Sequence, residues 1–180
     1  MPEHPGFDLN RINGRAMVRL RVRPKGADAA VKALQLPQQA LQWRGGDPAT
    51  YWLGPDQWLL TSDTKPAKDI LCHIDCTLSD QLYAATDMSS HYVCFALRGP
   101  AARTVLAMGC GIDMHRSAFM TGQCMQTNFA HVLLFIVVVE DNSFDLYVDR
   151  SHARYLSDWL VNSGEDPITR DSKCHKITVS

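Results

Sequence analysis

The sequence lacks the features that would place the protein in a membrane or on a nucleic acid. Its longest apolar run, residues 132–139, has eight residues, whereas a helix needs about 20 to span a bilayer. With 18 basic and 19 acidic side chains, the formal net charge is -1, so no overall field attracts phosphate backbones or anionic lipid. The first residues contain no apolar segment of a secretory signal. We expect a cytoplasmic globular protein that binds neither nucleic acid nor membrane.

A glycine-rich loop for a nucleotide is also missing. Gly109 and Gly111 lack the third glycine of a dinucleotide fingerprint. They also follow a predicted helix, whereas that fingerprint must follow a strand and open a helix. The sequence therefore predicts no flavin site and no nicotinamide site in this chain.

Cysteine is present, but its spacing does not match a metal site. A chain of this length can bury a full core, so its six cysteines are expected to be reduced thiols rather than disulfides. Fingers and ribbons bring CxxC turns together, and that spacing is absent here. The potential ligands are Cys72, His73, Cys76, Cys174 and His175. We predict no metal and interpret the helical thiols as buried or half-buried structural groups.

What is present is an alternation of strand and helix patterns. Arginines alternate with apolar residues over 17–23, which indicates a half-buried strand, and Pro24 is expected to end it. Asp28 is expected in the first turn of the following helix, which Pro37 closes. The elements expected in the first half are a strand at 17–23, a helix at 27–36, two strands or one bulged strand at 49–53 and 57–61, and a helix at 65–74.

The second half has a similar order of elements. They are a strand at 93–97, a helix from Pro100 to Gly109, a strand or hairpin within 122–139, a strand at 143–148, and a helix capped by Ser151. We predict one domain over 1–163, with pseudo-repeat halves at about 16–80 and 86–163. Split βαβ halves of the ferredoxin type produce this alternation. The polar segment 164–180 is assigned no structure.

Two sets of polar residues are candidates for a catalytic or a binding site. Asp87, Ser89, Ser90 and His91 contain the residue types of a hydrolase, but neighbours on a strand point to opposite faces, so turn chemistry is favoured. The arginines of the first strand, with Arg11 and Arg15 before them, form either a solvated strand face or a docking edge for an acidic partner surface. The candidate interface residues are Arg19, Arg21 and Arg23.

Four segments in order resemble a known family. They are 52–60 (WLGPDQWLL), 97–102 (LRGPAA), 118–124 (AFMTGQC) and 144–151 (FDLYVDRS), followed by Tyr155, Leu156, Trp159 and Leu160. Over about residues 52–160 the chain resembles the gamma subunits of heterotetrameric sarcosine oxidases, within the aminomethyltransferase-like, folate-binding superfamily. The resemblance implies an α+β fold in which two ferredoxin-like halves form one compact domain, like the first domain of aminomethyltransferases.

The resemblance also implies an accessory, non-catalytic role. The partners would be the alpha, beta and delta subunits, which would carry FAD, FMN, NAD and tetrahydrofolate and oxidatively demethylate sarcosine, with folate as acceptor of the methylene group. Folate-dependent relatives have an acidic residue after the helix that corresponds to 100–109, and Asp113 occupies roughly that place. The alternatives are a stand-alone folate-binding protein that uses Asp113, and a gamma subunit of a related complex such as N-methylglutamate dehydrogenase.

Overall fold

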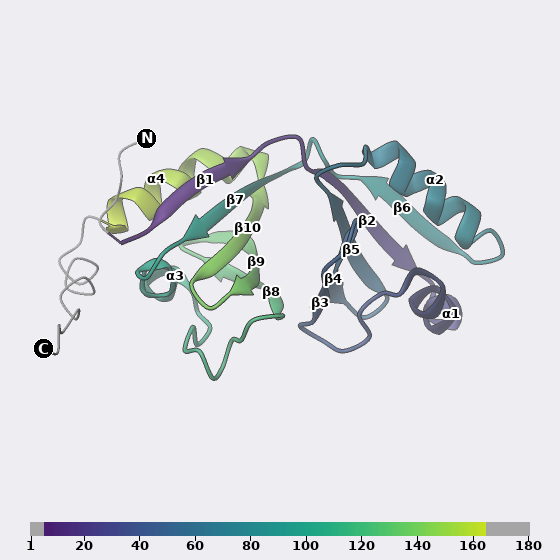
Figure 1. Cartoon of the computed structure of the whole chain (residues 1–180), viewed down its shortest axis with the longest axis horizontal. Helices are drawn as coiled ribbons and strands as arrows, with labels where there is room; N and C mark the ends of the chain where they lie inside the picture. Colours follow the sequence, from purple (N-terminus) through teal and green to yellow (C-terminus); the bar gives the residue numbers. More distant parts are fainter. Residues whose placement is uncertain (1–5, 165–180) are drawn as a thin grey trace, which may run out of the picture.

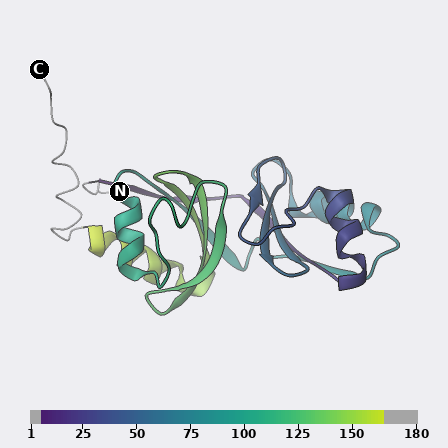
Figure 2. The ribbon, with the colours of Figure 1, turned by 90° about the horizontal axis from the view of Figure 1, so that it is seen from below.

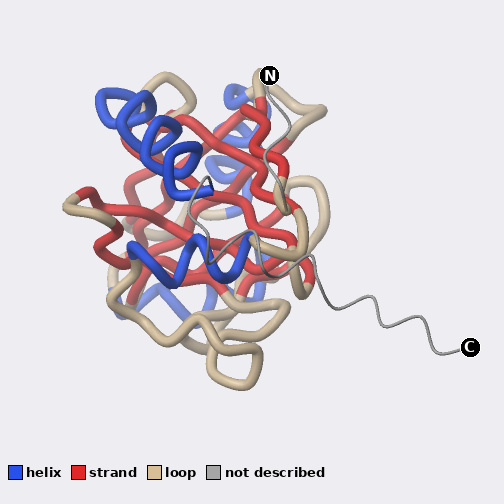
Figure 3. Tube along the Cα trace, turned by 90° about the vertical axis from the view of Figure 1, so that its left-hand side faces the viewer, coloured by secondary structure: helices blue, strands red, loops and turns tan. Residues whose placement is uncertain are grey.

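The computed structural model describes residues 6–164. Two five-stranded antiparallel sheets face each other, and helices cover the outer face of each sheet (Figure 1). Figure 3 shows the same arrangement from one end, with the helices placed around the strands. No helix within 6–164 combines the length and apolar character required to cross a membrane.

The first sheet has the strand order β3-β4-β5-β2-β6. Its strands are β2 (Ala16–Val22), β3 (Trp43–Arg44), β4 (Ala49–Gly54), β5 (Gln57–Ser62) and β6 (Tyr83–Asp87), and its helices are α1 (Pro24–Leu34) and α2 (Ala67–Thr77). Leaving out the short β3, the chain runs strand, helix, strand, strand, helix, strand, and the last strand pairs with the first. This half is therefore ferredoxin-like.

The second sheet has the order β1-β7-β10-β9-β8. Its elements are β1 (Asp8–Ile12), β7 (Tyr92–Arg98), α3 (Ala102–Gly109), β8 (Cys124–Phe129), β9 (Val132–Glu140), β10 (Ser143–Asp149), the 3-10 turn η1 (Arg150–His152) and α4 (Ala153–Gly164). The strand beside β7 is β1, which comes from the opposite end of the described chain. The N-terminal strand thus completes the second ferredoxin-like half, and the predicted α+β fold class is confirmed.

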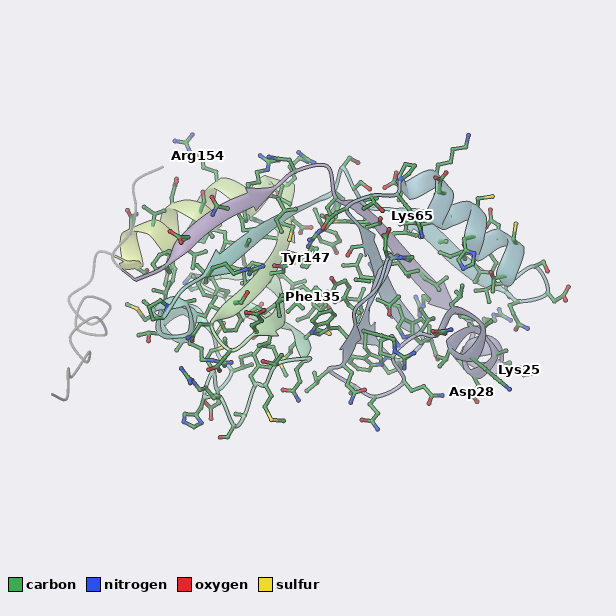
Figure 4. All side chains as sticks on the ribbon, in the orientation of Figure 1. Lys25, Asp28, Lys65, Phe135, Tyr147 and Arg154 are labelled. Atoms are coloured by element: carbon green, nitrogen blue, oxygen red, sulfur yellow. The ribbon has the colours of Figure 1, made fainter. Side chains whose placement is uncertain are left out.

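Local chemistry explains where the elements differ from expectation. Helix α1 begins at Pro24, because proline has a preset φ and lacks the N–H that would be unpaired in the first turn. Asp28 is therefore exposed in the second turn, not the first (Figure 4). The helix ends before Pro37, with Gln35 in the left-handed region at φ 52°. Ser151 lies inside η1 and does not cap α4.

Both segments left open in the sequence are hairpins. β4 and β5 pair directly, with Trp52 opposite Trp58. β8 and β9 are joined by Ala130 and His131, whose φ angles of 43° and 73° are both positive, as a tight two-residue turn between twisted strands requires.

Successive side chains of each strand point to opposite faces of its sheet, so the buried residues form three separate cores. Side chains of β2 such as Val18 and Leu20 pack under α1 and α2, and an equivalent core lies under α3 and α4. The opposite faces of the two sheets enclose a third cluster. Its buried members are Met17, Tyr51, Leu59, Cys94, Cys124, Phe135, Val137 and Tyr147. Each sheet is therefore buried on both faces over part of its area.

The two halves lie side by side and are joined at two places (Figure 2). The link from β1 to β2 runs beside the link from β6 to β7, and Arg15 in the first of these links donates to the Asp145 carboxylate of β10 at 2.7 Å. Elsewhere the edges of β3 and β8 meet, and the Trp43 N–H donates to the Gly122 carbonyl at 3.1 Å. These bonds hold the inner faces of the sheets together.

Candidate functional site

An aromatic cluster fills the space between the sheets. Tyr51 of the first sheet lies 6.0 Å from Phe135 and 5.9 Å from Tyr147 of the second, measured between ring centroids, and Trp43 stacks on Tyr51 at 5.7 Å. Phe135 and Tyr147 lie in the centre of the molecule in Figure 4. Burial raises the pKa of the Tyr147 hydroxyl well above its ordinary value, so the hydroxyl stays neutral and donates to the Tyr51 oxygen at 3.5 Å.

Beside these rings, Arg15 links the halves by ion pairs. Its Nε and Nη2 donate to the two carboxylate oxygens of Asp63 at 2.7 and 2.8 Å, and its Nη1 donates to Oδ2 of Asp145 at 2.7 Å. Arg98 binds the other oxygen of Asp145. Asp145 is 5% exposed, so this carboxylate depends on the two guanidinium groups for the hydrogen bonds that water would otherwise supply.

Burial and ion pairing together shift the pKa values of the cluster. Burial opposes the charge of Arg15, but the bonds to Asp63 and its other neighbours outweigh burial and raise the pKa of its guanidinium. The hydrogen bond from Arg15 lowers the pKa of Asp63. Burial, followed by the charge of Asp145, raises the pKa of the Cys94 thiol to about 12. The cluster therefore consists of paired ions and a neutral thiol, an arrangement suited to holding the halves together rather than to nucleophilic chemistry.

The sequence pattern did not reveal this role of Arg15. The pattern places Arg15 next to the arginines of β2, whereas its side chain lies in the cluster between the sheets, against Asp145 and Tyr147. The signal that was available is Asp145, a single acidic residue within the otherwise apolar run of β10, where both faces are buried. A carboxylate at such a position requires a cationic partner.

The polar residues between β6 and β7 shape the crossing between the halves. Oδ1 of Asp87 accepts the Ser89 N–H at 2.9 Å and the Ser89 hydroxyl at 2.6 Å, and the same hydroxyl oxygen accepts the Met17 N–H at 2.9 Å. His91 pairs with Asp149 at 2.7 Å. The interpretation of Asp87 and Ser89 as turn chemistry is confirmed.

Asp113 lies in the loop after α3, far along the chain from the arginines of β2. It is exposed, and its Oδ1 accepts the His115 N–H at 2.8 Å, which is ordinary turn chemistry. It does not line the surface hollows around Trp43, Met108 or Arg21. A folate role for Asp113 stays a prediction, which tetrahydrofolate titration of the wild type and Asp113→Asn would test.

The cysteines of α2 do not match their interpretation. Cys72 and Cys76 are exposed, because the buried face of this helix consists of Ala67, Ile70 and Ile74. Within residues 6–164 no three His, Cys, Asp or Glu side chains are grouped as metal ligands. Cys174 and His175 lie outside the described residues. The interpretation of Cys72 and Cys76 as buried or half-buried thiols was wrong.

Alkylation should separate these thiols. We expect iodoacetamide to modify Cys72 and Cys76 in the folded protein at mildly alkaline pH, while Cys94 and Cys124 stay unmodified. The latter two are buried, and burial raises the pKa of each to about 12, so little reactive thiolate is present. Peptide mass spectrometry measures the extent at each site. Equal rates at Cys72 and Cys94 without denaturant would contradict the structure, and denatured protein serves as the control.

Comparison with known proteins decides the family. Residues 23–166 match the model described as the sarcosine oxidase, gamma subunit family. The chain belongs to this family. The match runs from α1 through α4, so it covers most of both ferredoxin-like halves but leaves out β1 and β2. The resemblance seen in the sequence is confirmed.

Individual relatives belong to the same family. The chain is 27% identical over 115 residues to sarcosine oxidase subunit gamma of Corynebacterium sp. (strain U-96), covering 64% of this chain and 55% of the relative. It is 25% identical over 137 residues to the subunit of the same name from Arthrobacter sp., covering 75% and 66%. The aligned part of the chain thus spans about half to two thirds of the length of these curated relatives.

Solved structures show the same fold. A chain of the heterotetrameric sarcosine oxidase from Corynebacterium sp. U-96, in complex with pyrrole 2-carboxylate, superposes with a TM-score of 0.81 at 24% identity, covering 91% of this chain and 86% of that chain. Aminomethyltransferase T of the glycine cleavage system from Bartonella henselae gives a TM-score of 0.64 at 15% identity, covering 87% of this chain and 46% of that one. The fold is therefore shared with part of an aminomethyltransferase.

Proposed function

We propose that this chain is an accessory, non-catalytic gamma subunit of a heterotetrameric sarcosine oxidase in the cytoplasm, with alpha, beta and delta subunits as its partners. The observation that carries the proposal is the family match over residues 23–166. The fold shared with a chain of the heterotetrameric enzyme is consistent with it. The substrate would be sarcosine or a related N-methyl amino acid, bound outside this chain.

The described residues do not form the glycine-rich turn before a helix that a dinucleotide cofactor would need. A dinucleotide pyrophosphate binds where a glycine-rich turn opens a helix, but Gly109 and Gly111 come at and after the end of α3. The hollow that they line also contains Met108, Tyr155 and Trp159 and lacks a cationic lysine or arginine. We therefore assign FAD and NAD to the partner subunits. FMN and tetrahydrofolate are assigned there on the family resemblance, and no chemical step is assigned to this chain.

What this chain contributes is a rigid body. The two sheets are locked by the aromatic cluster and by the ion pairs of Arg15, so their outer surfaces keep a fixed relative position. A subunit of this kind stabilises larger partners by binding only their folded form, which shifts their unfolding equilibrium by mass action.

The test is purification of the tagged chain from its native host. We expect larger subunits to co-purify with a flavin absorption spectrum, and the eluate to consume oxygen when sarcosine is added. Oxidation of N-methylglutamate in place of sarcosine would favour the related dehydrogenase complex. A colourless chain without partners would overturn the proposal, and an untagged strain provides the background.

A further inference from the structure

β6 is an edge strand with an open outer side. It ends the order of the first sheet and pairs with β2. The Met88 N–H and the Leu82 carbonyl both bond to the β2 side, to Met17 and Arg23, and hydrogen-bonding direction alternates along an antiparallel strand. The backbone groups that point away from β2 are therefore those of Tyr83, Ala85 and Asp87. In residues 6–164 no further strand pairs with them.

This edge carries little of the usual protection against pairing. Natural edge strands are blocked by charged side chains, proline or bulges. Residues 83–86 are Tyr-Ala-Ala-Thr and pair with β2 without a shift in register, and the single charge of β6, the exposed Asp87, lies at its last position. Leu82, just before the strand, is 62% exposed. The corresponding edge strand of the other half, β1, carries the exposed charges of Asp8 and Arg11. The β6 edge is therefore the better template for an added strand.

Two arginines lie on the open sheet face beside this edge. Arg19 and Arg21 are exposed on the face of β2 opposite the helices, since Val18 and Leu20 pack beneath α1 and α2. Arg19 donates one bond to the Gln57 side chain. Among the described residues, neither arginine forms an ion pair with a carboxylate. Both guanidinium groups are therefore available to an acidic ligand.

Register places these charges within reach of an added strand. Arg19 lies opposite Thr86 and Arg21 opposite Ala84. These small side chains do not block the path of the arginines across β6. A strand added outside β6 would lie about 10 Å from β2, two strand spacings away. A long arginine side chain and a glutamate pointing toward it span such a gap. Because Arg19 and Arg21 are two residues apart, acidic residues at alternate positions would match them.

A surface hollow lies at the start of β6. Arg21, Arg23, Leu82 and Tyr83 line this hollow, with Asp56 from the β4–β5 turn on its wall. Its two arginines outnumber its one acid, and Leu82 adds an apolar surface. An extended segment that enters here with an apolar side chain next to an acidic one would match both.

We propose that the outer edge of β6 binds an extended acidic segment of a partner subunit. The segment adds a strand to the first sheet and places acidic side chains at alternate positions against Arg19 and Arg21. This interface rests on the proposed function in one respect, since it takes the bound segment to belong to a subunit of the same complex.

The test compares charge reversals in the tagged complex. We expect Arg19→Glu with Arg21→Glu to weaken binding of the flavin-containing subunits at least tenfold, and wild-type binding to fall with added salt. Lys68→Glu with Arg154→Glu changes the net charge equally at exposed positions of α2 and α4 (Figure 4 labels Arg154) and should bind like wild type. Equal binding by both double variants would overturn the interface and leave the proposed function intact.

A second variant tests the backbone contribution. Ala85→Pro removes an outward N–H without removing a bond to β2, and is expected to weaken binding about tenfold while the circular dichroism spectrum is retained. A photo-crosslinking residue at position 82 should join to a partner peptide with alternating acids. A crosslink to a helix or to a neutral segment would contradict the proposal. If the wild type captures no flavoprotein subunits, the proposed function fails, and the interface fails with it.

Discussion

Replacing Arg15 by methionine is expected to lower the free energy of unfolding by about 3 kcal/mol, because it leaves a buried carboxylate without one of its two cationic partners. Asp145 would retain Arg98 alone, and the bridge from Asp63 of the first half to Asp145 of the second would be lost. Urea unfolding followed by circular dichroism measures the change. A loss below about 1 kcal/mol, the value of an exposed pair, would contradict a central role for Arg15.

Two further variants separate the buried pair from the exposed one. Asp63→Asn removes the partner whose side chain is 56% exposed and should cost at most about 1 kcal/mol. Asp145→Asn added to Arg15→Met should recover part of the loss, because the buried charge is then absent. If the double variant were less stable than Arg15→Met alone, burial of an unpaired charge would not be the cause.

The same ion pair predicts a dependence on pH. The pKa of Asp63 is lowered in the folded state by its bond to Arg15, so its contribution is present above the unfolded pKa of about 4. It is lost as the pH falls through the lower folded value. We therefore expect the difference between wild type and Asp63→Asn to shrink as the pH falls below about 4. A difference that grows on acidification would contradict this sign.

Replacing Gly99 by alanine is expected to cost about 3 to 4 kcal/mol, which corresponds to a fall in melting temperature of roughly 10 °C for a chain of this size. Gly99 has a φ of 124°, where a side chain strains the backbone. An added Cβ would also lie 2.6 Å from the Gly6 carbonyl oxygen and 2.8 Å from Cα of Phe7. These are backbone atoms that lead into β1, so the clash would displace the strand that completes the second half.

Two glycines serve as matched controls. Gly122 has a φ of 87° but nothing within 4 Å of an added Cβ, and Gly111 has neither a strained φ nor a neighbour. Alanine at Gly122 should therefore cost about 1 kcal/mol from strain alone, and alanine at Gly111 should be close to neutral. A Gly99 variant no less stable than the Gly122 variant would show that contact with residues 6 and 7 does not matter.

Local patterns in the sequence were sufficient for elements within one stretch of chain. The alternation along β2 predicted its strand because one face meets the helices, and the proline at the start of the 65–74 segment correctly indicated a helix, which begins at Ala67. The start of α1 was misplaced because Pro24 was interpreted as the end of a strand, although proline suits both positions. The thiols of α2 were misplaced because cysteine is equally compatible with either face of a short helix.

Long-range pairing could not be read in the same way. β1 has only five residues, DLNRI, with weak alternation, and it is a strand because β7 offers an unpaired edge and Leu9 fills the core under α3 and α4. The role of Arg15 depends on Asp63 and Asp145, which are 48 and 130 residues away in the chain. No local pattern contains a partner at that distance.

The sequence alone determined the α+β class, the ferredoxin-like alternation and the family, since these depend on local periodicity and on short matching segments. Only the tertiary structure decided that β1 completes the second half, that Arg15 joins the two sheets, and that Arg19 and Arg21 lie beside an open strand edge. The physical reason is that these backbone pairs and ion pairs join segments that lie far apart in the sequence, so no local pattern of residues contains both partners.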